Sequence, residues 1–171
     1  MGATHFSGPV YSENGFITGT DSAAVPLGIA ATPVNSTGTT LAVTAADHSG
    51  KLVTINRAAG TAITLPAATG SGNIYRFFIG TTISSNSTTI KVANASDTMI
   101  GFVLSTLAAG GTTFGESAGG TDDTITMNGT TTGGIAGSYV ELRDQAANLW
   151  FVKGFLAGSG TLASSLSATV S

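Results

Sequence analysis

Two histidines supply the only imidazole groups available for acid–base chemistry. His5 lies near the start of the chain, and His48 lies in the run Asp47-His48-Ser49-Gly50. A nucleophilic serine needs a histidine and a carboxylate in a defined geometry, and in a chain so rich in serine that combination arises easily by chance. Small polar residues followed by glycine are typical of a turn. We interpret His48 as a turn residue. A small β-fold hydrolase is therefore less favoured than the two structural hypotheses given below.

The nine acidic residues are dispersed, and Asp122-Asp123 is their one adjacent pair. Calcium sites need several oxygen ligands, but no calcium-loop spacing surrounds this pair, and a turn before a strand explains it. A glycosidase needs two carboxylates that face each other across a cleft. Glu116 and Glu141 can be nominated for that role only arbitrarily. The chain has no cysteine. We predict no catalytic residues, no metal and no enzymatic activity.

Glycine-rich phosphate sites are also missing from the pattern. Gly50-Lys51 lacks the upstream glycine and the following Ser or Thr of a phosphate loop. Gly70-Ser71-Gly72 lacks the third glycine of a dinucleotide fingerprint. The six basic residues are scattered, none lies in the first fifty, and the net charge is −3. We therefore predict no cofactor and no nucleic-acid partner, which would need clustered Lys and Arg, and no basic signal-peptide start.

Low charge is the strongest compositional feature. Only 9% of the 171 residues are charged, against about 25% in ordinary globular proteins. Mean hydropathy is positive, +0.32, but no stretch approaches the roughly 20 apolar residues of a membrane span, so we predict no membrane partner. Thr and Ser hydroxyls covering a β-protein would account for this. Burial of the surface in an assembly would account for it better, because interface cores are depleted of charge and free proteins use charge to stay apart.

Residues 1–36 are interpreted as an extended N-terminal arm. Three of the four prolines in the chain are there, Pro9, Pro26 and Pro33, and proline disfavours regular helix. The arm is nevertheless too apolar for a solvated linker. It either covers its own domain or lies on a neighbouring protein. The residues we predict to bind the partner are Phe6, Val10, Tyr11, Phe16 and Ile17.

Residues 37–156 show the period-two alternation of half-buried strands. The alternating apolar pairs are Val53/Ile55, Ile63/Leu65, Ile90/Val92, Ile125/Met127 and Val140/Leu142. Short strands separated by glycine and asparagine turns indicate a sandwich or barrel. We predict an all-β domain, an antiparallel β-sandwich of jelly-roll type. Residues 157–171 form a short C-terminal tail that is mobile or adds an edge strand to a neighbour.

Four local features of this domain are predicted in more detail. Residues 139–143 and 149–153 form the clearest hairpin, with Trp150 and Phe151 on opposite faces, one in the core and the other available to a partner. The run Tyr75, Phe77, Phe78 and Ile79 reads as a more fully buried central strand. Residues 104–120 read as a long loop, because they contain Gly110-Gly111 and Gly119-Gly120. Helix is expected almost nowhere.

Several segments resemble small structural proteins encoded beside the major capsid protein of tailed bacteriophages. They are the runs Ser7–Phe16, Val43–Lys51, Ala62–Phe77 and Ser85–Asn94. The resemblance implies a capsid decoration (cement) protein, a homotrimer that binds the major capsid protein on the outer surface of the virion head and stabilises contacts between its subunits. The alternative is a head- or tail-fibre adhesin that binds a host-surface ligand, with Tyr139 or Trp150 exposed on its binding face.

Overall fold

The computed structural model describes residues 16–17, 26–27 and 32–170. The chain divides into two compact units, residues 1–31 and 32–171. In the first unit, β1 (Phe16–Ile17) pairs antiparallel with β2 (Pro26–Leu27). The predicted partner-binding residues Phe6, Val10 and Tyr11 lie outside the described residues.

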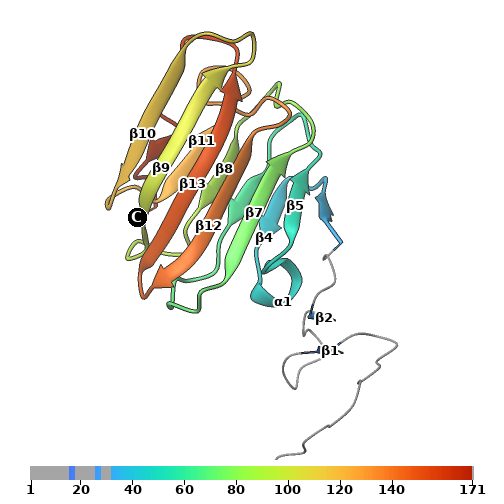
Figure 1. The fold of residues 1–171 in the computed structure, drawn as a ribbon, viewed down its shortest axis with the longest axis vertical. Helices are drawn as coiled ribbons and strands as arrows, with labels where there is room; N and C mark the ends of the chain where they lie inside the picture. The colour runs from blue at the N-terminus through green and yellow to red at the C-terminus, as the bar shows by residue number, and fades with distance from the viewer. Residues whose placement is uncertain (1–15, 18–25, 28–31, 171) are drawn as a thin grey trace, which may run out of the picture. The chain divides into compact units, whose positions relative to one another are not determined.

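The second unit is all-β and contains two mixed sheets (Figure 1). The larger sheet has the order β10 (Thr113–Gly119), β9 (Thr98–Leu107), β13 (Leu149–Gly158), β12 (Tyr139–Ala146), β7 (Ile74–Ile79), β5 (Leu52–Ile55), β3 (Val34–Ser36). The smaller sheet has the order β14 (Leu166–Ser167), β11 (Thr124–Met127), β8 (Thr88–Lys91), β6 (Ala62–Thr64), β4 (Thr40–Ala42).

The first half of this unit winds between the sheets, so the prediction of purely antiparallel pairing is wrong. Strands β3 to β8 alternate between the larger and the smaller sheet along the chain. Successive strands in each sheet therefore run in the same direction, with β3, β5 and β7 parallel in one sheet and β4, β6 and β8 parallel in the other. The second half is built mainly from antiparallel pairs, with β9 and β13 as a further parallel pair.

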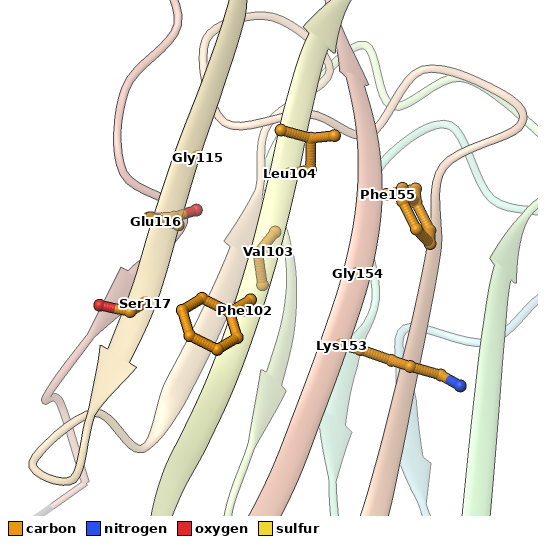
Figure 2. A pocket seen from close by; sticks show the side chains of 9 residues that line it. All are labelled: Phe102, Val103, Leu104, Gly115, Glu116, Ser117, Lys153, Gly154 and Phe155. Atoms are coloured by element: carbon orange, nitrogen blue, oxygen red, sulfur yellow. The ribbon is translucent and has the colours of Figure 1, made fainter.

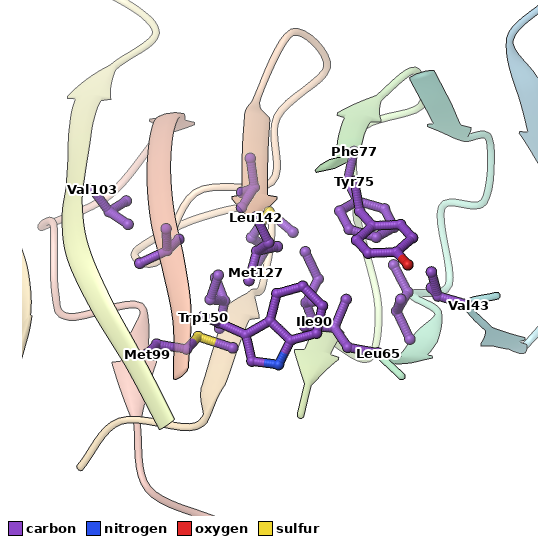
Figure 3. Packing of buried hydrophobic residues seen from close by; sticks show 14 of the residues in the cluster. Val43, Leu65, Tyr75, Phe77, Ile90, Met99, Val103, Met127, Leu142 and Trp150 are labelled. Atoms are coloured by element: carbon purple, nitrogen blue, oxygen red, sulfur yellow. The ribbon is translucent and has the colours of Figure 1, made fainter. Parts of the chain in front are cut away.

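One hydrophobic core joins the two sheets, as alternation places one face of every long strand inward. The burial pattern of β13 alternates along its whole length, and that of β9 does so over nearly all of it. Tyr75 and Trp150 meet edge to face with ring centroids 5.7 Å apart, an arrangement that aromatic pairs favour. Figure 3 shows this packing. The largest fully buried side chains are Trp150, Tyr75, Phe77, Ile55, Ile63, Leu65, Ile79, Ile83, Ile90, Met99, Ile125 and Met127.

The predicted hairpin is confirmed, and its strands are longer than expected. Glu141 lies opposite Lys153, and the register shifts at a bulge between Asp144 and Ala146. The prediction of a loop over residues 104–120 is wrong, because β9 and β10 form a second hairpin there. The glycines fall in its turn at 110–111 and at its end at 119–120 rather than interrupting the strands.

Two smaller expectations also need correction. The run Asp47–Gly50 is not a simple turn, because Ala45–His48 forms a single helical turn, α1, with Thr44 as its N-cap. Strand β7 is not buried on both faces: Tyr75, Phe77 and Ile79 are buried, while Phe78 points outward and is half-buried.

The end of the chain belongs to the second unit. Ala157 and Gly158 are the last residues of β13 and not the start of the predicted tail. Strand β14 pairs antiparallel with β11, with Leu166 opposite Ile125. Glu116 and Asp123 accept hydrogen bonds from the backbone of this segment at Ser165, Thr169 and Val170. The tail thus adds an edge strand to its own sheet.

Candidate docking surface

The outer face of the larger sheet carries an apolar patch on two neighbouring strands. Strands β9 and β13 run parallel, which places Ile100 beside Phe151 and Leu104 beside Phe155. Phe102 is the most exposed of the group at 71%, followed by Phe155 at 61%. Figure 2 shows both rings on the same side of the sheet. The apolar patch is defined as the exposed large apolar residues of the described chain: Ile100, Phe102, Leu104, Phe151 and Phe155.

The size of the apolar patch points to a function. A buried aromatic side chain hides about 150–250 Å², so the partly exposed members of the apolar patch together present several hundred Å². The largest apolar patch on a typical monomer is about 300–600 Å² and is often functional. Single exposed apolar residues need no explanation, but a contiguous set on adjacent strands does.

The outer face of the smaller sheet is different in kind. Except for Lys91 on β8, its outward residues are small or hydroxylated: Thr40 and Ala42 on β4, Ala62 and Thr64 on β6, Thr89 on β8 and Thr126 on β11. Both faces come from the same chain, of which 42% is hydrophobic. The same overall composition gives a Thr-rich outer face on the smaller sheet, so composition alone does not explain the apolar patch.

A row of ionic side chains crosses the outer face beside the patch. Glu141 on β12 accepts hydrogen bonds from the Arg76 Nε–H and the Tyr139 hydroxyl, each at 2.9 Å, and its other oxygen lies 2.9 Å from Lys153 Nζ. Burial alone would raise the pKa of Glu141, but the bonds from Lys153, Arg76 and Tyr139 lower it below its usual value. Burial, and then the bond to Glu141, raises the pKa of Tyr139 to about 12. At neutral pH the Glu141 carboxylate is therefore ionised and the Tyr139 hydroxyl is protonated.

An open pocket of about 460 Å³ lies between the apolar patch and β10. Its apolar walls are formed by Phe102, Leu104 and Phe155 (Figure 2). On the side of β10 it is lined by the small residues Gly115 and Ser117. An apolar pocket with aromatic walls is typical of the anchoring points of protein interfaces. The two charged residues that line the pocket do not interact with each other across it. The Glu116 carboxylate bonds to Ser164 and Ser165, and Lys153 bonds to Glu141.

Asp144 and Asp122 each hold a loop of the described chain through hydrogen bonds. Asp144 accepts bonds from the backbone of Thr69, Gly70 and Ser71 and from the Ser71 hydroxyl. Asp122 accepts from the Gly119 N–H. Glu116 and Glu141, the pair nominated above for a glycosidase, lie on opposite sides of the larger sheet: Glu116 is opposite inward-facing Val103 in the β9–β10 register, while Glu141 is opposite outward-facing Lys153.

His48 takes part in the capping of its own helix. Its side chain is buried, and its Nδ1 lies 3.0 Å from the Thr44 backbone nitrogen. Asp47 bonds to the Thr44 hydroxyl and not to the imidazole. The described residues contain no group of three or more His, Asp or Glu side chains that could hold a metal ion. Residues 32–170 also contain no helix that is long and apolar enough to cross a membrane.

The comparisons with known proteins are negative throughout. No family model, curated protein or solved structure was found to match the chain.

Sequence reasoning assigned partner binding to the arm and missed most of the apolar patch. Of the arm residues, Phe16 and Ile17 form β1. The sequence predicts one of Trp150 and Phe151 in the core and the other available to a partner, and the structure places Trp150 in the core and Phe151 on the outer face. The prediction that Trp150 is exposed on the binding face of a fibre adhesin is therefore wrong. The pattern that could have revealed the rest is the run Met99–Leu104, where the residues on both faces of the strand are apolar.

Proposed function

We propose that the chain is a non-enzymatic structural protein that docks onto the outside of a phage capsid and stabilises contacts between major capsid subunits. The observation that carries the proposal is the apolar patch: five large apolar side chains exposed together on β9 and β13. The resemblance of the N-terminal and central segments to decoration proteins implies that the partner is the major capsid protein and that the chain forms a homotrimer. Docking onto a partner protein would remove this surface from water, which is favourable.

Two further features support a structural role. In this proposal the two sheets form a sandwich-like block, and the carboxylates that hold Ser71, Gly119 and Ser165 stiffen its loops and tail. A jelly roll would require antiparallel neighbours throughout, and parallel pairs such as β5 with β7 do not fit it. A rigid block that touches several shell subunits gains from multivalency, because the second contact is effectively intramolecular.

The docking surface can be tested with matched variants on the two outer faces. The double variant Phe102→Ser with Phe155→Ser should bind heads at least tenfold more weakly, because burial of each ring is worth about 1.5–3 kcal/mol. The double variant Thr64→Ser with Thr126→Ser alters the outer face of the smaller sheet and should bind as the wild type does. The measurement is the number of copies retained by expanded heads, read from quantitative gels. Equal binding by both double variants would refute the apolar patch as the docking site.

The arm is tested separately. A chain without residues 1–31 keeps β3 and the rest of the second unit, so it should retain the folded β-domain and lose binding to heads. If the shortened chain still saturates the heads, the arm does not take part in docking. Copy number in purified particles distinguishes decoration, with hundreds of copies, from a fibre, with a handful. Complete absence from particles would end both proposals.

A further inference from the structure

Of the four edges of the two sheets in the second unit, one differs from the other three. The larger sheet ends in β10 and β3, and the smaller in β14 and β4. Strands β3, β4 and β14 have two or three residues each, whereas β10 has seven. Proteins shorten or charge exposed edges because an open edge pairs with another strand. Strand β10 contains no Lys or Pro, and its one charged residue, Glu116, is bonded to Ser164 and Ser165. Apart from this inward carboxylate, which is already paired, the edge has no charge, no proline and no shortening to protect it.

The hydrogen bonds of the β9–β10 hairpin fix which backbone groups of β10 are free. The Leu107 N–H donates to the Thr112 carbonyl, and the Gly120 N–H donates to the Met99 carbonyl. Antiparallel ladders alternate, so residues 114, 116 and 118 exchange bonds with β9, while Thr113, Gly115 and Ser117 direct N–H and C=O outward. The Gly119 N–H, which also points outward, is already bound by Asp122 at 2.8 Å.

The free groups are exposed and unused. Thr113, Gly115 and Ser117 are all exposed, and Figure 1 places β10 at the margin of the larger sheet. No hydrogen bond from another described element reaches their backbone N–H or C=O groups. The open edge therefore offers three donors and three acceptors, symmetrically arranged about Gly115.

We propose that β10 pairs antiparallel with β10 of a second copy of this chain, with Gly115 opposite Gly115 of the other copy. In this register Thr113 lies opposite Ser117 on both sides of the two-fold axis, and all six free groups are satisfied. Centring the pair on residue 116 would place Glu116 directly opposite its own copy, and like charges in that position destabilise a sheet. Centring it on residue 117 would need the Gly119 N–H that Asp122 holds.

The side chains fit the same register. Thr113, Gly115 and Ser117 have small side chains or none, so two copies of β10 approach without obstruction. A Thr opposite a Ser also forms a favourable cross-strand pair. The two-fold axis is normal to the sheet, which keeps both outer faces on one side. The pocket beside Phe102 and Leu104 then adjoins the same pocket of the second copy. This β10–β10 pairing does not depend on the capsid proposal. It can join two single chains or two trimers.

Gly115→Pro tests the pairing, because proline removes the outward N–H and is tolerated on an edge strand. The matched control is Gly115→Ala, which keeps the N–H; its Cβ would lie 3.9 Å from Leu104 Cδ1, an ordinary contact. Light scattering should give the wild type and Gly115→Ala twice the mass of Gly115→Pro. Fluorescence of the one tryptophan, buried Trp150, checks that each variant is folded. Equal masses for wild type and Gly115→Pro would overturn the proposal.

Cross-linking tests the register even if the proline variant fails to fold. The chain has no cysteine, so Gly115→Cys adds a single thiol that would face its own copy. Cα atoms of directly opposite residues in a hydrogen-bonded pair are about 5.5 Å apart, within the range of a disulfide. Gly115→Cys should give a covalent dimer under mild oxidation, and Ser117→Cys, which faces Thr113, should remain mostly monomeric on a denaturing gel. Faster cross-linking by Ser117→Cys would overturn the register.

Discussion

Trp150 and Phe151 are consecutive residues of β13 that lie on opposite faces of the larger sheet, with exposures of 0% and 38%. The first contributes to the shared core and meets Tyr75 edge to face. The second belongs to the apolar patch. Their different environments separate a residue that stabilises the core from one that lies on the exposed surface of the sheet.

Substitution of these two residues should affect stability very differently. Trp150→Ala should lower the free energy of unfolding by about 3–5 kcal/mol, because it leaves a large cavity in the core. Phe151→Ala should change it by no more than about 0.5–1 kcal/mol, as expected for a surface position. Urea unfolding followed by circular dichroism measures both. Similar losses in the two variants would show that Phe151 is packed as tightly as Trp150 in the isolated protein.

The strands that alternate cleanly could be predicted from the sequence. In β5, β8, β11 and β12 the expected apolar residues all point into the core. The winding of β3 to β8 between two sheets could not be predicted, because alternation identifies the inward face of a strand but not the sheet that it joins. The first three strands of the larger sheet along the chain begin at residues 34, 52 and 74, so no constant repeat length indicates the stacking.

The candidate site was predicted only in part, and β9 explains why. Alternation is obvious where polar and apolar residues take turns, but in β9 both the inward Met99 and Val103 and the outward Phe102 and Leu104 are apolar. Such a strand is read as buried or, when glycines follow it, as a loop. The roles of Asp144 and Glu116 were also missed, because the residues they bind are distant in sequence.

Asp144 should make the stability depend on pH in the acid range. Burial alone would raise its pKa, but bonds from the Ser71 hydroxyl and from the N–H groups of Gly70, Ser71 and Thr69 lower it to about 2, against 3.8 for a free aspartate. The unfolded chain therefore binds the proton more readily. The stabilisation, about 2 kcal/mol, is complete above about pH 4–5 and is lost as the pH falls toward 2.

Asp144→Asn provides the control for this pH dependence. The variant should be less stable at neutral pH, and its free energy of unfolding should fall less steeply than that of the wild type between about pH 5 and pH 2. Urea unfolding at a series of pH values measures the difference between the two curves. Parallel curves over this range would show that Asp144 has the same pKa in the folded and unfolded chains.

Glu116 should hold the tail to the body of the protein. Its carboxylate accepts bonds from the Ser165 N–H and hydroxyl and from the Ser164 hydroxyl, and the Ser165 carbonyl in turn accepts from the Thr126 N–H. Glu116→Ala leaves the buried Ser165 donors without a partner, at a cost of about 1–3 kcal/mol. Hydrogen exchange should accelerate at the amides of Ser165 and Thr126. The amides of Thr169 and Val170, which Asp123 binds, serve as an internal control and should exchange as before.

A side chain at Gly129 should be destabilising because it would collide with the Ile83 backbone. Gly110, which has a similar φ but free space around it, serves as the control. Gly129 has φ of +80°, and a Cβ there would collide with the Ile83 carbonyl oxygen. Gly110 has φ of +84° but no atom within 4 Å of a Cβ position. Gly110→Ala should therefore cost only the left-handed penalty of about 1–2 kcal/mol, while Gly129→Ala adds the displacement of the Ile83 backbone. Thermal unfolding should show a clearly lower midpoint for Gly129→Ala; equal midpoints would mean that the turn at Gly129 relaxes away from Ile83 without cost.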